Sequence, residues 1–170
     1  MNIELLDSRA AQRRTDDLIE LLQDAVDSGA SVGFLPPLSR EAASEYWRAV
    51  FADVDAGRRL LLGALSGERL VGSVQLELAT KPNALHRAEV QRLLVHRASR
   101  RQGIGERLMR RLEALAVERG RSLLVLDTRH GDPSELLYRK LGYTKAGMIP
   151  GYARSADGTL DATVFYFRRT

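Results

Sequence analysis

The stretch from Ala88 to Glu106 constrains the fold of this chain more than any other. Its first part, residues 88–95, is rich in apolar side chains and predicts a strand. A basic loop follows, and from Ile104 apolar residues recur at spacings of three and four, which predicts an amphipathic helix. Gly103 and Gly105, where loop and helix meet, can adopt positive φ and let a ligand approach the backbone. Because a helix start carries free N–H groups and the positive end of the helix dipole, this junction predicts an anion site suited to phosphate or pyrophosphate.

Two motifs make that interpretation more specific. Arg100-x-x-Gly103-x-Gly105 resembles the pyrophosphate loop of the GCN5-related N-acetyltransferase (GNAT) family, and the segment 137–143, Leu-Tyr-Arg-Lys-Leu-Gly-Tyr, resembles a second motif of that family. The resemblance implies that acetyl-CoA is the acetyl donor and that the loop amides bind its pyrophosphate. The cofactor-binding residues that it implies are Leu93, Leu94, Val95, Arg100, Arg101, Gln102, Gly103, Ile104, Gly105 and Glu106.

The composition predicts one globular domain, residues 1–170, with 44% hydrophobic residues to build a core. The chain has no cysteine, which fits a reducing compartment, and its three histidines show no metal-ligand spacing. The N-terminus does not look like a signal peptide, and no apolar run approaches the roughly 20 residues of a membrane span. We therefore expect a cytoplasmic protein without a metal or a membrane partner.

Charge and aromatic content argue against a nucleic-acid partner. The net charge is +4, and 22 acidic residues are interspersed among 26 basic ones. Aromatic residues make up only 6% of the chain, which is poor for base stacking. We expect a small-molecule amine as partner, and a homodimer is possible.

The rest of the chain predicts an alternation of strands and helices. The further strands expected are 2–7, 60–65, 70–79, 123–128, 143–148 and 163–167, and the further helices are 15–28, 39–57 and 133–141. Thr15 and Ser39 are the expected N-caps, 150–152 is an expected turn, and the apolar strand at 123–126 is expected to be covered on both faces. This order predicts an α/β fold, and with the family resemblance a mixed, mostly antiparallel central sheet with helices on both faces.

The strands ending at Val95 and Thr128 are joined through a helix, so they should run parallel. Ligands of open sheets bind at the carboxyl ends of such strands, which places the basic loop and Asp127 around one cleft. The resemblance implies that these two strands splay apart and that the pantetheine arm lies between them.

Acetyl transfer to an amine needs a group that removes a proton, donors for the oxyanion and an acid for the thiolate. The resemblance implies backbone N–H groups near Leu94 and Val95 as oxyanion donors and Tyr138 as the acid, although Tyr138 could also be a core aromatic residue. Glu89 and Asp127 lie in otherwise apolar strands, where a carboxylate is costly unless it is paired or functional. Either could be the base; otherwise Glu89 would form an ion pair with Arg87 or Arg92, and Asp127 would cap the following loop.

The sequence departs from the family pattern before the last helix, where many members have an asparagine that contacts the pantetheine. Asp132 or Ser134 could partly replace it here. Other segments resemble one family member that acetylates the amino group of a β-lactam amino-acid toxin: 29–34, 81–83, 87–91, 126–128 and 150–152. An N-acetyltransferase for a small, amino-acid-like molecule is thus the leading hypothesis. The alternatives are a peptide, protein N-terminal or polyamine acetyltransferase, an acetyl-CoA sensor and a nucleic-acid module.

Overall fold

The computed structural model describes all 170 residues. Seven strands form one sheet in the order β1-β2-β3-β4-β5-β7-β6, and every neighbouring pair is antiparallel except β4 and β5. The strands are β1 (Asn2–Leu6), β2 (Arg59–Ser66), β3 (Arg69–Leu78), β4 (Arg87–Val95), β5 (Leu123–Arg129), β6 (Thr144–Arg154) and β7 (Leu160–Arg169). The predicted mixed, mostly antiparallel sheet is confirmed.

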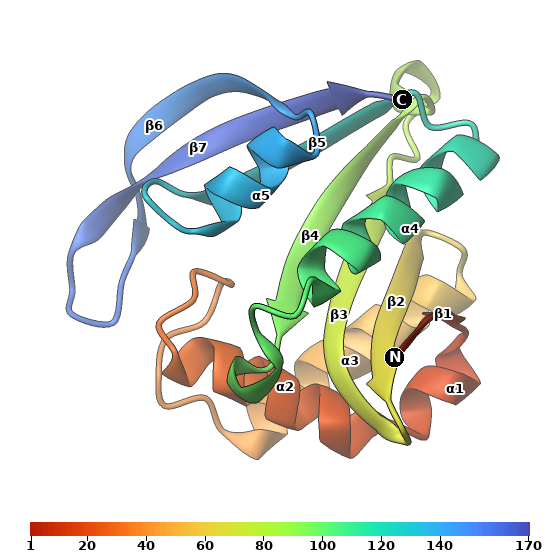
Figure 1. Cartoon of the computed structure of the whole chain (residues 1–170), viewed down its shortest axis with the longest axis vertical. Coiled ribbons are helices and arrows are strands. Elements are labelled where there is room, and N and C mark those ends of the chain that lie inside the picture. Colours follow the sequence, from red (N-terminus) through yellow and green to blue (C-terminus); the bar gives the residue numbers. More distant parts are fainter.

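Helices cover both faces of this sheet, as predicted (Figure 1). They are α1 (Ser8–Gln12), α2 (Thr15–Asp27), α3 (Arg40–Asp55), α4 (Ile104–Glu118) and α5 (Ser134–Lys140). Two short 3-10 turns, η1 (Pro82–Ala84) and η2 (Arg97–Ser99), flank β4. Ser39 caps α3 as expected, because its side chain accepts a hydrogen bond from the N–H of Ala42.

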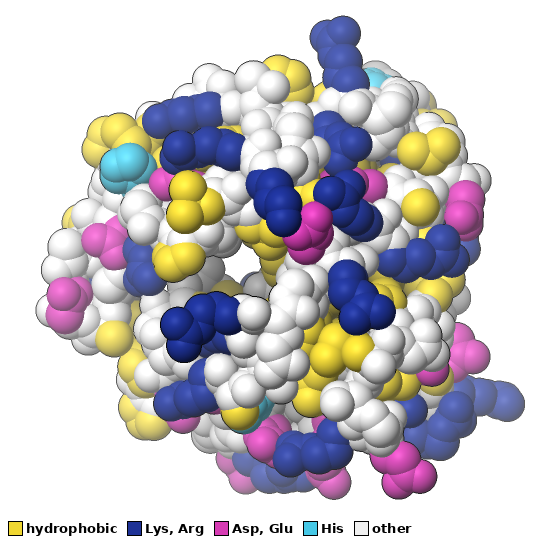
Figure 2. All heavy atoms as spheres, viewed as in Figure 1, with side chains coloured by type: hydrophobic (Ala, Val, Ile, Leu, Met, Phe, Trp, Pro, Cys, Tyr) yellow, Lys and Arg dark blue, Asp and Glu magenta, His cyan; other side chains and the backbone are white.

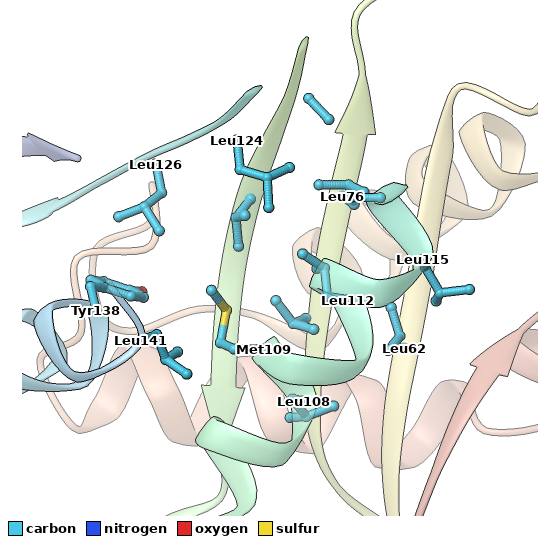
Figure 3. Close-up of a cluster of buried hydrophobic side chains, with 14 of the residues drawn as sticks. Leu62, Leu76, Leu108, Met109, Leu112, Leu115, Leu124, Leu126, Tyr138 and Leu141 are labelled. Atoms are coloured by element: carbon cyan, nitrogen blue, oxygen red, sulfur yellow. The ribbon is translucent and has the colours of Figure 1, made fainter. Parts of the chain in front are cut away.

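Each face of the sheet has its own core. One core lies under α4 and α5, where the helix stripe that begins at Ile104 packs on alternate residues of β2 to β5 and β7 (Figure 3). The other lies under α1 to α3 and is centred on the fully buried Trp47, whose indole N–H donates to the Leu18 carbonyl at 2.8 Å. The central strands β2 to β4 therefore contribute buried residues to both cores.

The parallel pair β4 and β5 is joined only at its start. Arg87, Ala88 and Glu89 face Leu123, Leu124 and Val125, and beyond Glu89 the two strands have no paired residues. Figure 1 shows them diverging toward the carboxyl end of β4. The splayed arrangement that the family resemblance implied is therefore present, and it leaves the edge of β4 that faces β5 without a neighbouring strand.

Several local predictions were wrong. Residues 150–152 do not form a turn but continue β6 through an irregularity in its register with β7. Thr15 does not cap α2, since its hydroxyl donates back to the Gln12 carbonyl at 2.7 Å. The short helix α1, capped by Asp7, was not predicted. In β5 only Leu124 and Leu126 are buried; because the chain alternates at every residue, the other face of the strand is open to the cleft.

Candidate active site

The carboxyl end of β4 is reshaped by a bulge. The register with β3 slips between the pairs Ser73–Leu94 and Gln75–Gln91, and Arg92 has a φ of 47°. Positive φ is uncommon for a residue with a Cβ, and a bulge redirects the side chains around it. Together with the missing partner strand on the β5 side, the bulge leaves backbone groups of residues 91–95 available to a ligand in the cleft.

The basic loop after β4 provides a row of free backbone donors. Arg101 and Gly103 both have positive φ, 60° and 75°, and Gly103 occupies the N-cap position of α4. The N–H groups of six successive residues, 101–106, find no acceptor within the protein. An anion placed there would satisfy these donors and lie at the positive end of a helix of 15 residues. The loop thus fits a pyrophosphate group.

Gly105 departs from its prediction, because it is helical and its φ is not positive. A Cβ at this position would lie 3.4 Å from Leu137 Cδ2 and 3.7 Å from Leu93 Cδ2. The absence of a side chain at Gly105 therefore leaves space where the first turn of α4 borders the cleft. Its role is close approach and not a special backbone conformation.

A cavity of about 530 Å³ opens between this loop and the start of α5. Figure 2 shows a hollow on this side of the molecule, with Lys and Arg side chains around its rim. Of the predicted cofactor residues, all but Gln102 line the cavity: Leu93, Leu94, Val95, Arg100, Arg101, Gly103, Ile104, Gly105, Glu106, Asp132 and Ser134. The structure adds Ser28 and Arg129, which lie outside the motifs, and Leu137 and Lys140 of the second motif, which the sequence had not assigned to the cofactor.

Two of the charged residues at this rim, Arg100 and Glu106, form hydrogen bonds or ion pairs with other groups of the protein. The Arg100 guanidinium donates to the Val95 carbonyl at 3.0 Å and to Ser28 Oγ at 3.3 Å, so it braces the loop against α2. Glu106 is bonded to Lys140 Nζ at 2.6 Å and to Arg110. Arg101 forms no ion pair and is exposed, which leaves its charge available to a ligand.

A second cavity of about 370 Å³ continues from the first along β4 and β5. The two cavities share Ala30, Leu93, Asp132 and Ser134. Only the second cavity is lined by Glu89, Asp127 and Tyr138. The structure therefore brings the three predicted catalytic residues together, outside the cavity that borders the free N–H groups of residues 101–106. The loop of residues 30–33 forms the outer wall of the second cavity.

The sequence of this chain matches the sequence model of the acetyltransferase (GNAT) family over residues 18–143. The chain belongs to the GNAT acetyltransferase family. It is therefore an acetyl-CoA-dependent acetyltransferase, and acetyl-CoA is its acetyl donor.

Solved structures agree with this fold. The ribosomal-protein-alanine N-acetyltransferase from Brucella melitensis is 18% identical with a TM-score of 0.81, and 100% of each chain is covered. The protein yncA from Salmonella typhimurium, solved with its cofactor acetyl-CoA, is 18% identical with a TM-score of 0.79, covering 99% of this chain and 93% of that one. A protein described as a phosphinothricin N-acetyltransferase is 21% identical with a TM-score of 0.76, covering 99% and 97%. None of the helices combines the length and apolar character that a membrane crossing requires.

The carboxylates of Glu89 and Asp127, which line the second cavity, form no ion pairs. Glu89 makes no ion pair with Arg87 or Arg92 and accepts only a hydrogen bond of 3.3 Å from Gln91 Nε2. The Asp127 side chain has no hydrogen-bond or ion-pair partner. Loss of hydration in the cavity raises the pKa of both carboxyl groups, and for Glu89 the nearby carboxylates of Glu77 and Asp127 raise it further. Both groups are thus poised to take up a proton more readily than an ordinary surface carboxylate.

Tyr138 belongs to the core and to the site at once. Its ring packs at 5.9 Å from Tyr143 and 6.1 Å from Tyr166, and the residue is only 6% exposed. Its hydroxyl end points from α5 toward β4 (Figure 3) and reaches the second cavity. Burial raises its pKa, with Asp127 and Asp132 adding to the effect, so the hydroxyl keeps its proton at neutral pH.

Arg92 is the site residue that the motifs did not reveal. Its guanidinium lies 4.6 Å from the ring centre of Tyr46 and 6.0 Å from that of Phe34, and its Nε donates to the Val32 carbonyl at 3.1 Å. It lines the second cavity and forms no ion pair. The aromatic faces stabilise the cation without neutralising it, so its terminal N–H groups can bind an anion.

The loop that departs from the family pattern is held in place from both ends. Asp132 pairs with Arg129 at 3.3 Å, and Ser134 Oγ lies 2.8 Å from Thr128 Oγ1. Both residues line both cavities, so they lie where the two cavities meet. The buried Glu135 accepts from the Gly131 N–H at 2.7 Å and from the Tyr166 hydroxyl, which fixes the loop to β7. No motif in the sequence pointed to this anchor.

Proposed function

We propose that the protein transfers the acetyl group of acetyl-CoA to the amine of a small, amino-acid-like molecule. The observation that carries the proposal is the combination of Glu89, Asp127 and the unpaired Arg92 in one cavity of about 370 Å³. Two carboxylates attract an ammonium group, and a guanidinium binds a carboxylate with two parallel hydrogen bonds. An acceptor that carries both groups on a small skeleton would satisfy all three side chains.

The catalytic roles follow from this arrangement. Glu89 takes the proton from the ammonium so that the amine becomes a nucleophile, and Asp127 holds the amine beside the thioester. Near Leu94 and Val95, a backbone N–H that points to the free edge of β4 stabilises the oxyanion. Tyr138 donates a proton to the departing thiolate. The amides of residues 101–106 hold the pyrophosphate, and Asp132 and Ser134 contact the pantetheine arm.

Two resemblances favour an amino-acid-like acceptor. The segments 29–34, 87–91 and 126–128, which resemble the tabtoxin resistance protein, all contribute to the second cavity or its rim. That family member acetylates a β-lactam amino-acid toxin, and one structural neighbour is described as acting on phosphinothricin. A resistance role against such a toxin or antibiotic is part of the proposal.

A thiol-release assay with acetyl-CoA tests the proposal with matched acceptors. Each amino acid is compared with its amide, which keeps the amine but lacks the carboxylate, and with polyamines, aminoglycosides and peptides. We expect kcat/KM to favour amino acids over their amides. A preference for polyamines, aminoglycosides or peptide N-termini would instead support one of the alternative acceptors and refute the amino-acid proposal.

Arg92→Met identifies the source of that preference. It should lower kcat/KM for the preferred amino acid at least tenfold, about 1.4 kcal/mol, and leave the amide nearly unchanged. Arg92→Lys keeps a charge at the position and serves as the matched control, with a smaller loss. An equal loss on the acid and the amide would mean that Arg92 supports the loop of residues 30–33 and does not bind the substrate.

A further inference from the structure

A row of polar side chains crosses the sheet from β2 through β3 to Glu89 on β4. Arg59 on β2 is paired with Glu77 on β3, and Glu77 is paired with Glu89 on β4. The next pair along, Gln75 and Gln91, lies on the same face because side chains two residues apart in a strand point the same way. Only Glu89 and Gln91 of these five line the proposed acceptor cavity.

Hydrogen bonds join the row into one network. Arg59 donates to Glu77 at 2.9 Å, to Gln91 Oε1 at 2.9 Å and to Gln75 Oε1 at 2.6 Å. Gln91 Nε2 in turn donates to Glu77 at 2.8 Å and to Glu89 at 3.3 Å. Since arginine has donors only, it fixes the amide oxygen of Gln91 toward itself and the NH₂ group toward the two carboxylates.

Burying this network is energetically unfavourable, which indicates a role beyond holding the strands together. The Arg59 side chain is 11% exposed, Gln75 is fully buried, and the buried Nε of Arg59 has no acceptor. A buried cation with an unmet donor stabilises a sheet less than apolar side chains would. A second branch runs from Gln75 to the Tyr46 hydroxyl at 2.8 Å, and the Tyr46 ring lies under Arg92. Both branches therefore end at charged groups of the acceptor cavity.

We propose that Arg59, Glu77 and Gln91 are positioning residues that hold the Glu89 carboxylate in place and set the pH at which it takes up a proton. The proposal rests on the proposed function in one respect, the role of Glu89 as the base. Glu77 is a like charge that favours the protonated form of Glu89, and Arg59 opposes that effect across the same row. The balance between these two residues outside the cavity would then tune the base within it.

Other charged or titratable groups also face Glu89 or its network. They are Asp127 on β5, Arg92 on β4, Asp132 before α5, Tyr138 on α5, and Asp53 on α3, which lies 3.5 Å from Arg59. None of them is substituted in the variants below. Arg59→Met also removes the cation beside Asp53, which leaves a second carboxylate uncompensated and acts on Glu89 in the same direction as the uncompensated Glu77.

Two substitutions should move the pKa of Glu89 in opposite directions. Glu77→Gln removes the like charge and should lower it, while Arg59→Met leaves Glu77 uncompensated and should raise it, each by at least about half a pH unit. Arg59→Lys keeps the positive charge and should restore the wild-type value. The double variant Arg59→Met/Glu77→Gln should lie between the two single variants.

The measurement is a ¹³C NMR titration of the Glu89 side-chain carboxyl, assigned with Glu89→Gln, beside the pH profile of kcat/KM. Shifts of the Glu89 titration in opposite directions in Glu77→Gln and Arg59→Met support the positioning role of the network. A matching movement of the acid limb of kcat/KM also supports Glu89 as the base. If the Glu89 titration shifts but the acid limb of kcat/KM stays in place, the positioning role is supported and Glu89 is refuted as the base. Glu77→Gln is the conservative variant, and it decides the test if Arg59→Met fails to fold. An unchanged Glu89 titration in folded Glu77→Gln overturns the proposal.

Discussion

At the scale of single residues, the double position of Tyr138 in core and cavity leads to a kinetic prediction. Tyr138→Phe removes only the hydroxyl and keeps the ring against Tyr143 and Tyr166. We expect kcat to fall about 10²-fold or more, because acid catalysis contributes that much, with acetyl-CoA affinity nearly intact. Steady-state kinetics and calorimetry measure the two quantities. A variant with full kcat would leave Tyr138 as a core residue only.

Glu89 and Asp127 can be told apart by their pH profiles. The pKa of Glu89 is raised in the folded enzyme, so the acid limb of kcat/KM should lie above the ordinary glutamate range of about 4.3. Glu89→Gln should lower kcat and remove this limb, whereas Asp127→Asn should mainly raise KM. The reverse pattern would exchange their roles; because the two carboxylates influence each other, the limb in the wild type belongs to the pair.

At the scale of elements, the start of α4 depends on the small size of Gly105. Gly105→Val adds a side chain beside Leu137 and Leu93 without backbone strain, since the residue is helical. We expect acetyl-CoA affinity to fall at least tenfold, about 1.4 kcal/mol, with a melting temperature no lower than that of the wild type. Gly105→Ala is the graded control and should lose less. Unchanged affinity in calorimetry would contradict the placement of the cofactor.

The loop before α5 should lose its anchor in acid. The hydrogen bond from Tyr166, together with those from Gly131 and Arg139, lowers the pKa of Glu135 to about 2 despite its burial. A lowered pKa stabilises the fold above the unfolded value of about 4.3, and this contribution disappears as the pH falls toward 2. Denaturant unfolding should therefore show the wild type losing its advantage over Glu135→Gln between these pH values. A constant difference between the two proteins would refute the assignment.

At the scale of the whole molecule, short-range patterns predicted the fold well. The strand, basic loop and helix around Gly103 are set by local periodicity and glycine placement, and the family motifs fixed their order. The course of β6 through 150–152 was missed because a Pro-Gly pair predicts a turn, whereas pairing with β7 holds it extended. Arg92 and Arg59 were missed because their partners come from other strands and from a loop about 60 residues away in sequence. The alternating polar residues at 75, 77, 89 and 91 were a signal that could have revealed the polar face of the sheet.

We expect one continuous cleft to hold acetyl-CoA at its amide-lined end and an amine acceptor at its carboxylate-lined end. A crystal structure of the enzyme with bound coenzyme A tests this most directly. We expect the pyrophosphate within hydrogen-bond distance of the amides of residues 101–106, the pantetheine arm between β4 and β5, and the thiol at the entrance of the cavity that holds Glu89, Asp127 and Tyr138. Coenzyme A bound with its thiol away from these three residues would rule out this arrangement of the cleft.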